Sequence, residues 1–206
     1  RHPEYEHFLE EDWLYEAVIE TYLPLLRMMD RLDHDGVPFR LTMTLSPTLC
    51  AMLTDPLLMR RCERRIDALL QLASKERKRL DRSRSDFLEA TLFAEQEFLD
   101  LRELFIGTYN RDLIGAFARQ RAKGSVEIMT SGATHAFLPL MMQTEEAVRA
   151  QIQVATTEFK RIFDFEPEGI WLPECGYYPG VEKFLVEAGL RYSFLESHGV
   201  TACEPS

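Results

Sequence analysis

The sequence predicts an α/β fold in which a parallel sheet alternates with helices. Four short segments, 39–45, 125–130, 169–172 and 192–195, have the composition of strands. Helical segments separate each strand from the next, which is the pattern of βαβ units and favours parallel pairing. Polar side chains follow three of the strands, as expected where parallel strands end beside a ligand.

The N-terminal part is expected to be helical up to the first strand. Segment 11–32 has apolar residues at three- and four-residue steps, which indicates a helix. Pro24 interrupts this helix and should mark a kink or a junction, because proline has no N–H to donate. Apolar and polar residues alternate over 39–45, and 46–47 then suit the start of a short helix over 48–53.

The stretch 55–123 is helical and highly charged. Its first helix should begin at 55–56, and further helices are predicted over 86–105 and 110–121. Because this stretch is long for one crossover, we interpret it as a helical insertion over the face of the sheet. The basic run 75–82 suits a solvated helix face, with a phosphate site as the alternative.

The remaining predicted elements are joined by two loops of interest, one over 131–140 and one that begins at Pro173. After the strand 125–130, the loop 131–140 contains small residues that let the backbone turn closely. Helices are predicted over 144–163 and 180–188. The intervening strand should stop at Pro173, which cannot donate to a sheet ladder.

The length and composition of the chain exclude some classes of function. The chain has 206 residues, enough for one sizeable domain, and a net charge of −10 argues against a nucleic-acid partner. The apolar runs are too short for a transmembrane span, and the polar N-terminus is not a signal peptide. The four cysteines, Cys50, Cys62, Cys175 and Cys203, form no C-x-x-C pair, so neither a zinc ribbon nor a redox motif is indicated. Because the chain is not small and cysteine-dense, a reduced, cytoplasmic setting is expected.

The leading candidate for chemistry is Glu174, directly after the strand that Pro173 ends. A carboxylate at this position could act as a nucleophile or as an acid/base, or could simply cap the strand. Trp171 and Tyr177 lie close in sequence and offer rings that could stack on a sugar.

Other polar strand ends are weaker candidates. His135 could bind a substrate hydroxyl or orient a carboxylate, or could be a structural histidine. Glu127 could hydrogen-bond His135 or face solvent, and Glu196 with His198 suit a surface loop. Trp13 and Trp171 are both more typical of core residues than of sugar platforms, and Trp171 is the better platform candidate of the two.

A metal site formed by His135, Glu174 and His198 is a weak alternative, because no H-E-x-x-H motif or histidine pair at i, i+4 occurs. We therefore expect no metal and no cofactor. The sequence does not support a serine hydrolase or a nucleoside triphosphatase, because it has no G-x-S-x-G elbow and no P-loop.

Three blocks together resemble family 57 glycoside hydrolases of the α-glucan branching type. Residues 2–17 resemble the segment after the family's first strand, and 124–140 resemble its second motif. The third motif, Trp171-Leu172-Pro173-Glu174-Cys175-Gly176-Tyr177, carries the catalytic nucleophile in that family. The resemblance spans essentially the whole chain.

The resemblance implies a distorted (β/α)7 barrel, incomplete in this chain, and a retaining double displacement on α-1,4-glucan that forms α-1,6 branches. Glu174 would be the nucleophile. His135 would fall among the sugar-contacting residues near the cleavage site. Independently of the resemblance, we expect Trp171, Tyr177 and Trp13 to bind the substrate. The partner would be an amylose- or glycogen-like α-glucan, with no nucleic acid and no membrane.

This sequence departs from the family pattern at both ends. The family's histidine-rich first motif would precede residue 1, and the aspartate that acts as general acid would follow residue 206. The chain is therefore expected to be the N-terminal part of a barrel and inactive by itself, with open sheet edges that could associate. A 4-α-glucanotransferase or α-amylase of the same family, a metal-dependent polysaccharide deacetylase and a non-catalytic glucan-binding module stay open as alternatives.

Overall fold

The computed structural model describes residues 4–83 and 86–201, and the chain divides into two compact units. The helical unit comprises Arg1–Phe39 with Leu53–Gln120, and the sheet unit comprises Arg40–Met52 with Arg121–Ser206. The helices of the predicted insertion thus share a unit with the N-terminal helices. The first residues of the family-like N-terminal block and Cys203 lie outside the described residues.

In the helical unit, the N-terminal helix is continuous but changes its winding. It consists of α1 (Leu9–Ala17), the π-helical turn η1 (Val18–Tyr22) and α2 (Leu23–His34). Pro24 at the start of α2 cannot donate a backbone hydrogen bond to the preceding turn, and the π turn lies directly before it. Pro24 therefore marks a junction, as the sequence predicted.

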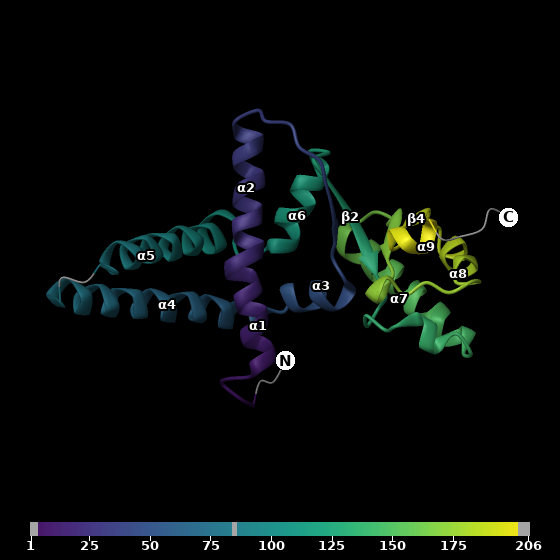
Figure 1. Ribbon diagram of the computed structural model, residues 1–206, viewed down its shortest axis with the longest axis horizontal. Helices are drawn as coiled ribbons and strands as arrows, with labels where there is room; N and C mark the ends of the chain where they lie inside the picture. The colour runs from purple at the N-terminus through teal and green to yellow at the C-terminus, as the bar shows by residue number, and fades with distance from the viewer. Residues whose placement is uncertain (1–3, 84–85, 202–206) are drawn as a thin grey trace. The chain divides into compact units, whose positions relative to one another are not determined.

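A long antiparallel hairpin of α4 (Pro56–Ser83) and α5 (Leu88–Glu103) extends away from α1 and α2 (Figure 1). Asp55 caps α4 by accepting hydrogen bonds from the backbone N–H of Leu57 at 2.8 Å and of Leu58 at 3.2 Å. After α5 come the π turn η2 (Leu104–Thr108) and α6 (Leu113–Ala122). The start of α6 is later than predicted, because Asn110 and Arg111 adopt left-handed backbone angles.

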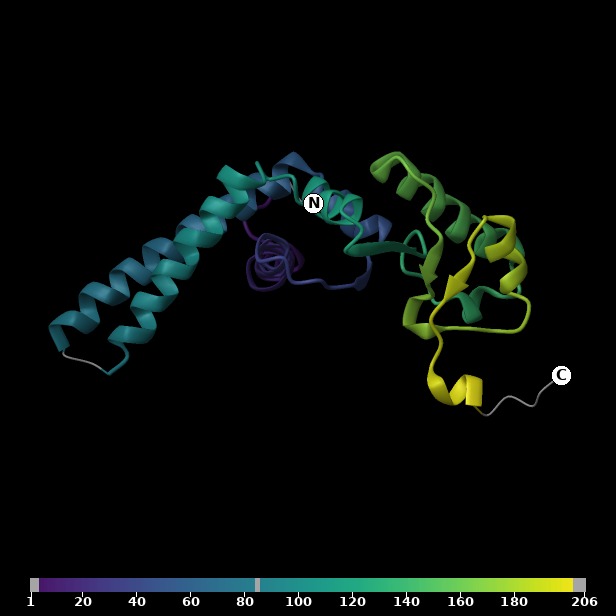
Figure 2. The same cartoon turned by 90° about the horizontal axis from the view of Figure 1, so that it is seen from above.

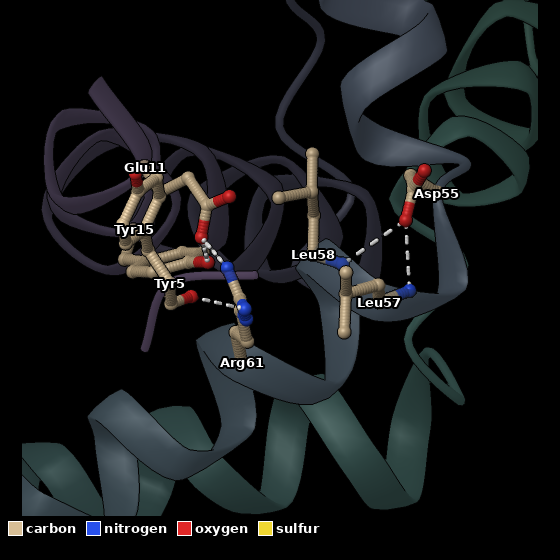
Figure 3. Close-up of polar contacts among 7 residues, drawn as sticks. All are labelled: Tyr5, Glu11, Tyr15, Asp55, Leu57, Leu58 and Arg61. Atoms are coloured by element: carbon tan, nitrogen blue, oxygen red, sulfur yellow. Dashed lines mark hydrogen bonds and ion pairs between the residues drawn. The ribbon is translucent and has the colours of Figure 1, made fainter. Parts of the chain in front are cut away.

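A buried ion pair joins α1 to α4. Arg61 Nη1 donates to Glu11 Oε2 at 2.5 Å, and both side chains are only 7% exposed (Figure 3). Tyr15 also donates to Glu11 at 2.9 Å, while Arg61 Nη2 donates to the backbone carbonyl of Tyr5 at 2.6 Å. Each buried charge is thus matched, which offsets its loss of hydration.

The sheet unit contains a parallel sheet with strand order β1-β2-β3-β4 within the described residues. The predicted α/β fold with a parallel sheet is confirmed. The strands are β1 (Leu41–Thr44), β2 (Val126–Ser131), β3 (Gly169–Trp171) and β4 (Tyr192–Ser193). The helices are α3 (Pro47–Leu53), α7 (Glu145–Phe163), α8 (Glu182–Glu187) and α9 (Ser197–Thr201).

Three short helical segments were not predicted. They are the 3₁₀ turns η3 (Leu138–Met141) and η4 (Pro173–Cys175), and α9. All three are too brief to show a repeating apolar pattern, which is the signal that identifies a helix in a sequence.

The two faces of the sheet differ in character. On one face, Ile170 belongs to a buried apolar cluster that includes residues of α7 and α8, and these two helices cover that face (Figure 2). Because successive residues of a strand point to opposite faces, Ser131 and Trp171, which are paired in register, lie on the other face. That face carries the residues with candidate chemistry.

Among the described residues, no helix is long and apolar enough to cross a membrane. Cys50 and Cys62 are buried as free thiols, and Cys175 is a half-buried free thiol.

Candidate functional site

The candidate site lies where β2 and β3 end side by side. A pocket of about 410 Å³ opens there, lined by Thr44, Ser46, Leu49, Ser131, His135 and Trp171. Its residues come from β1, β2 and β3 and the segments that follow them, so the parallel register brings them to one edge. Of these six residues, His135 and Trp171 are predicted from the sequence and the other four are not.

Glu174 and His135 come together at this edge. Glu174 Oε1 lies 3.4 Å from His135 Nε2, with the two side chains 74% and 46% exposed. The pair becomes an ion pair when the imidazole is protonated. An exposed carboxylate beside a histidine can act as a nucleophile or as a proton acceptor toward a bound ligand.

Both residues have strained backbone conformations. His135 and Glu174 each have a φ of 56°, and Cys175 has a φ of 53°. Residues with a Cβ rarely adopt this left-handed region, at a cost of about 1–3 kcal/mol each. Such strain persists only where the surroundings impose it, and it is concentrated at functional sites.

Neighbouring side chains impose the turn at His135. From α7, Gln151 accepts a hydrogen bond from the N–H of Thr134 at 2.9 Å and donates to its hydroxyl at 2.8 Å. The backbone carbonyl of Gln151 also accepts from the N–H of Ala133 at 3.0 Å. One glutamine of a regular helix therefore fixes the loop before His135.

The loop after Glu174 packs against the His135 loop through a glycine. A Cβ at Gly176 would lie 2.6 Å from the Phe137 ring and 3.0 Å from Pro139. Only glycine permits this approach without displacement of the ring. The two loops that carry the candidate residues are thus fixed against each other.

Ser131 is a site residue that the sequence analysis missed. Its hydroxyl donates to the Trp171 carbonyl at 2.9 Å, and its Oγ lies 3.4 Å from His135 Nδ1. Ser131 therefore connects the ends of β2 and β3 and contacts the imidazole that faces Glu174. The available signal was a polar residue at the end of an otherwise buried strand, beside Gly132.

Trp171 belongs to a row of rings on the same sheet face. Its ring centroid lies 6.2 Å from that of Phe194, which lies 6.1 Å from that of Tyr192. Tyr192 in turn donates a hydrogen bond to Glu127 on β2. Glu127 therefore pairs with Tyr192 rather than with His135. The pKa of Tyr192 is raised, mainly because its hydroxyl is buried and secondly because it donates a hydrogen bond to Glu127.

Gly169 makes the Tyr192–Glu127 contact possible, because the tyrosine ring crosses β3 at this glycine. We predict that Gly169→Ala destabilises the protein by about 1–3 kcal/mol, the usual cost of overpacking. The added Cβ would lie 2.3 Å from Tyr192 Cζ. Thermal unfolding measures the effect.

Gly199→Ala is the matched control, because no neighbour within residues 4–83 and 86–201 approaches a Cβ built at that position to within 4 Å. It should leave stability nearly unchanged. Tyr192→Ala combined with Gly169→Ala should lose less than the two single changes added together. Full additivity would contradict a direct clash between the two side chains.

The other predicted residues differ in their exposure and in their contacts. Tyr177 is 46% exposed, and its hydroxyl contacts Glu182 at 3.4 Å. Trp13 is 59% exposed on α1 of the helical unit, rather than buried as a core residue. Glu196 and His198 are strongly exposed and lie 3.7 Å apart. The roles of Tyr177 and Trp13 in binding stay predictions.

The metal alternative finds no ligand cluster in the described part of the chain. No group of three or more histidine, cysteine, aspartate or glutamate residues there is arranged to bind a metal ion.

Comparison with known proteins gives a consistent family. The chain is 34% identical to a 1,4-α-glucan branching enzyme of Thermococcus kodakarensis, over 91% of this chain and 29% of that protein. It superposes on the crystal structure of an α-amylase from Thermotoga maritima with a TM-score of 0.90 and 40% identity, over 96% of this chain and 37% of that one. It superposes on the crystal structure of a branching enzyme from Pyrococcus horikoshii with a TM-score of 0.84 and 32% identity, over 91% of this chain and 38% of that one.

The chain thus spans about a third of the length of these relatives. The sequence model of one family, glycosyl hydrolase family 57, matches residues 1–205. This match covers the Glu174 and His135 loops together with both units, and the chain therefore belongs to glycosyl hydrolase family 57.

Proposed function

We propose that this chain supplies the nucleophile for retaining glycosyl transfer on α-1,4-glucan, with formation of α-1,6 branches. The observation that carries the proposal is the exposed Glu174 carboxylate 3.4 Å from His135 at the carboxyl edge of a parallel sheet. An exposed carboxylate can reach the anomeric carbon of a sugar in the adjoining pocket.

In the first step, Glu174 attacks the anomeric carbon, the glycosidic bond breaks, and a β-linked glycosyl-enzyme forms. In the second step, the 6-hydroxyl of another glucan chain takes the glycosyl group and forms the branch. Water as the acceptor gives hydrolysis instead. His135 donates a hydrogen bond to a sugar hydroxyl beside the cleaved bond, and Trp171, Tyr177 and Trp13 offer rings for stacking.

Retention requires a second carboxyl group about 5–5.5 Å from the nucleophile. It protonates the leaving oxygen in the first step and takes the proton of the acceptor hydroxyl in the second, when the bond to Glu174 breaks. By resemblance to the family, we assign this role to an aspartate outside residues 1–206. The strands described above would then be part of a distorted (β/α)7 barrel, with 55–123 as an inserted helical segment. On this proposal, the isolated chain has little or no activity.

We further propose a cytoplasmic enzyme that acts on an amylose- or glycogen-like polymer. The named relatives support an α-glucan substrate, but they include both branching enzymes and an α-amylase. The acceptor is therefore the point that an experiment has to decide.

The test is to incubate amylose with the gene product that contains this chain, and to follow iodine staining and reducing ends together. Branching should lower the stain while reducing ends stay nearly constant, and isoamylase should then release short chains. A rise in reducing ends in step with the loss of stain would replace branching by hydrolysis. Loss of stain with no chains released by isoamylase would favour 4-α-transfer.

A further inference from the structure

The hydroxyl of Ser131 has one hydrogen and two polar neighbours. The Trp171 carbonyl oxygen lies 2.9 Å from Ser131 Oγ, and His135 Nδ1 lies 3.4 Å from it. A carbonyl oxygen can only accept, and it is the nearer of the two, so the hydroxyl hydrogen is donated to Trp171. Toward His135, Ser131 Oγ therefore offers only a lone pair. Nδ1 has to carry a hydrogen in order to bind it.

The other ring nitrogen of His135 also faces an acceptor. Nε2 lies 3.4 Å from Oε1 of Glu174, and an ionised carboxylate has no hydrogen to donate. A neutral imidazole has a single N–H, so it can satisfy Ser131 or Glu174 but not both. An imidazolium has two N–H groups and satisfies both neighbours at once.

Other groups around the ring leave this count unchanged. Within residues 4–83 and 86–201, Glu174 is the one charged side chain at ion-pair distance from the ring. Ser131 is 0% exposed, so solvent does not compete for its hydrogen. The rest of the pocket lining has no titratable side chain and consists of Thr44, Ser46, Leu49 and Trp171.

We propose that Ser131 is a positioning residue that keeps His135 charged while Glu174 is ionised. Because Ser131 holds Nδ1–H, the ring can donate through Nε2 only when it carries a second proton. The inference rests on the proposed function in one respect, since there His135 donates a hydrogen bond to a sugar hydroxyl. As pH rises and the Nε2 proton leaves, the ring turns a lone pair toward Glu174 and the sugar, and this donor is lost.

Diethyl pyrocarbonate tests the charge of the ring without reference to activity, because it acylates neutral imidazole and not imidazolium. The gene product is treated over a range of pH, and the rate at His135 is measured on its peptide by mass spectrometry. His135 is 46% exposed, so the reagent can reach the ring. In Ser131→Ala, Nδ1–H loses its acceptor and the neutral ring becomes more populated. Around neutral pH, modification should be about two- to tenfold faster than in the wild type, the effect of one hydrogen bond.

Thr130→Val is the matched control, because it deletes the hydroxyl of another residue of β2 that is 0% exposed. Thr130 donates to the Ser131 carbonyl at 3.3 Å, and its side chain lies on the opposite face of the sheet. The rate–pH curve of His135 should therefore stay unchanged in this variant.

Two further variants at position 131 separate the hydroxyl from the size of the side chain. Ser131→Thr retains the hydroxyl and should react as the wild type does. Ser131→Cys is close to serine in size but is a weak acceptor, so its curve should move in the same direction as that of Ser131→Ala. At high pH, where every ring is neutral, all rates should agree. A faster reaction of Ser131→Ala only there would mean a more accessible ring, and would overturn the proposal.

The second readout is the pH dependence of kcat for the loss of iodine stain on amylose. Its basic limb should move to lower pH in Ser131→Ala and stay in place in Thr130→Val. An unmoved modification curve in Ser131→Ala would overturn the proposal, and so would an equal movement in Thr130→Val. A moved modification curve with an unmoved activity profile would overturn the part of His135 as a charged donor in the reaction. Failure of the proposed function is a separate result, since it is seen as unchanged activity of Glu174→Gln.

Discussion

Replacing Glu174 by glutamine is expected to lower glucan-transfer activity of the gene product by at least roughly 10³-fold, the scale on which loss of a nucleophile acts. The amide has nearly the same shape as the carboxylate but is far less nucleophilic. Glu174 is 74% exposed, so folding should be little affected. The measurement is the rate of iodine-stain loss on amylose, with thermal unfolding as the check on folding.

Glu196→Gln is the matched control, because it makes the same change at an exposed glutamate that follows β4 and lies 3.7 Å from His198. Its activity should remain near the wild-type level. Equal losses in the two variants would show that the effect is not specific to Glu174. Unchanged activity of Glu174→Gln would remove Glu174 from the mechanism.

Chemical rescue separates a nucleophile from an acid or base at the same position. In a Glu174→Ala variant, added azide should attack α-glucosyl fluoride from the face that the carboxylate vacated. A C–N bond forms, fluoride leaves, and the product is the β-glucosyl azide. An α-glucosyl azide would mean that another group forms the covalent intermediate, and that Glu174 acts in proton transfer.

Arg61→Ala is expected to produce the largest loss of stability, about 3–5 kcal/mol, because it leaves Glu11 buried without its cation. Glu11 and Arg61 are each 7% exposed and join two helices that are far apart in the sequence (Figure 3). The Tyr15 hydroxyl, which donates to Glu11 at 2.9 Å, would remain, but it carries no charge. Denaturant unfolding followed by circular dichroism at the helical signal measures the loss.

Arg79→Ala provides the control on the same helix. Arg79 pairs with Glu76 at 2.7 Å, but these side chains are 66% and 39% exposed. An exposed pair of this kind contributes about 0–1 kcal/mol, so the variant should unfold close to the wild type. The double variant Glu11→Leu with Arg61→Met should recover much of the loss, since it removes both buried charges. A loss from Arg61→Ala no greater than that from Arg79→Ala would contradict a structural role for the pair.

The sequence predicted the strands and the main candidate residues because their signals are local. Alternating residues marked β1 and β2, and Pro173 placed the end of the strand before Glu174. Glu174 and His135 were both selected from strand ends, and the parallel register brings them to 3.4 Å. That proximity follows from the rule that parallel strands end at one edge of the sheet.

Other features depend on partners that are distant in the sequence. Apolar periodicity showed which face of each helix is buried, but not that 55–123 would pack with the N-terminal helices. Gly169 read as an ordinary strand residue, because its role depends on the ring of Tyr192 from another strand. The sequence pattern placed Arg61 on the apolar side of its helix, but only its contact with Glu11 explains the burial of a charge there.

The left-handed backbone at His135 and Glu174 implies that stability and the candidate function make opposite demands on these two positions. Glycine at either position would adopt the observed φ without the steric strain that a Cβ imposes, and so would relax the loop that it occupies. It would also remove the imidazole or the carboxylate. Selection for heat resistance alone would therefore favour variants with an empty site, and an engineering campaign on this protein should hold both positions fixed.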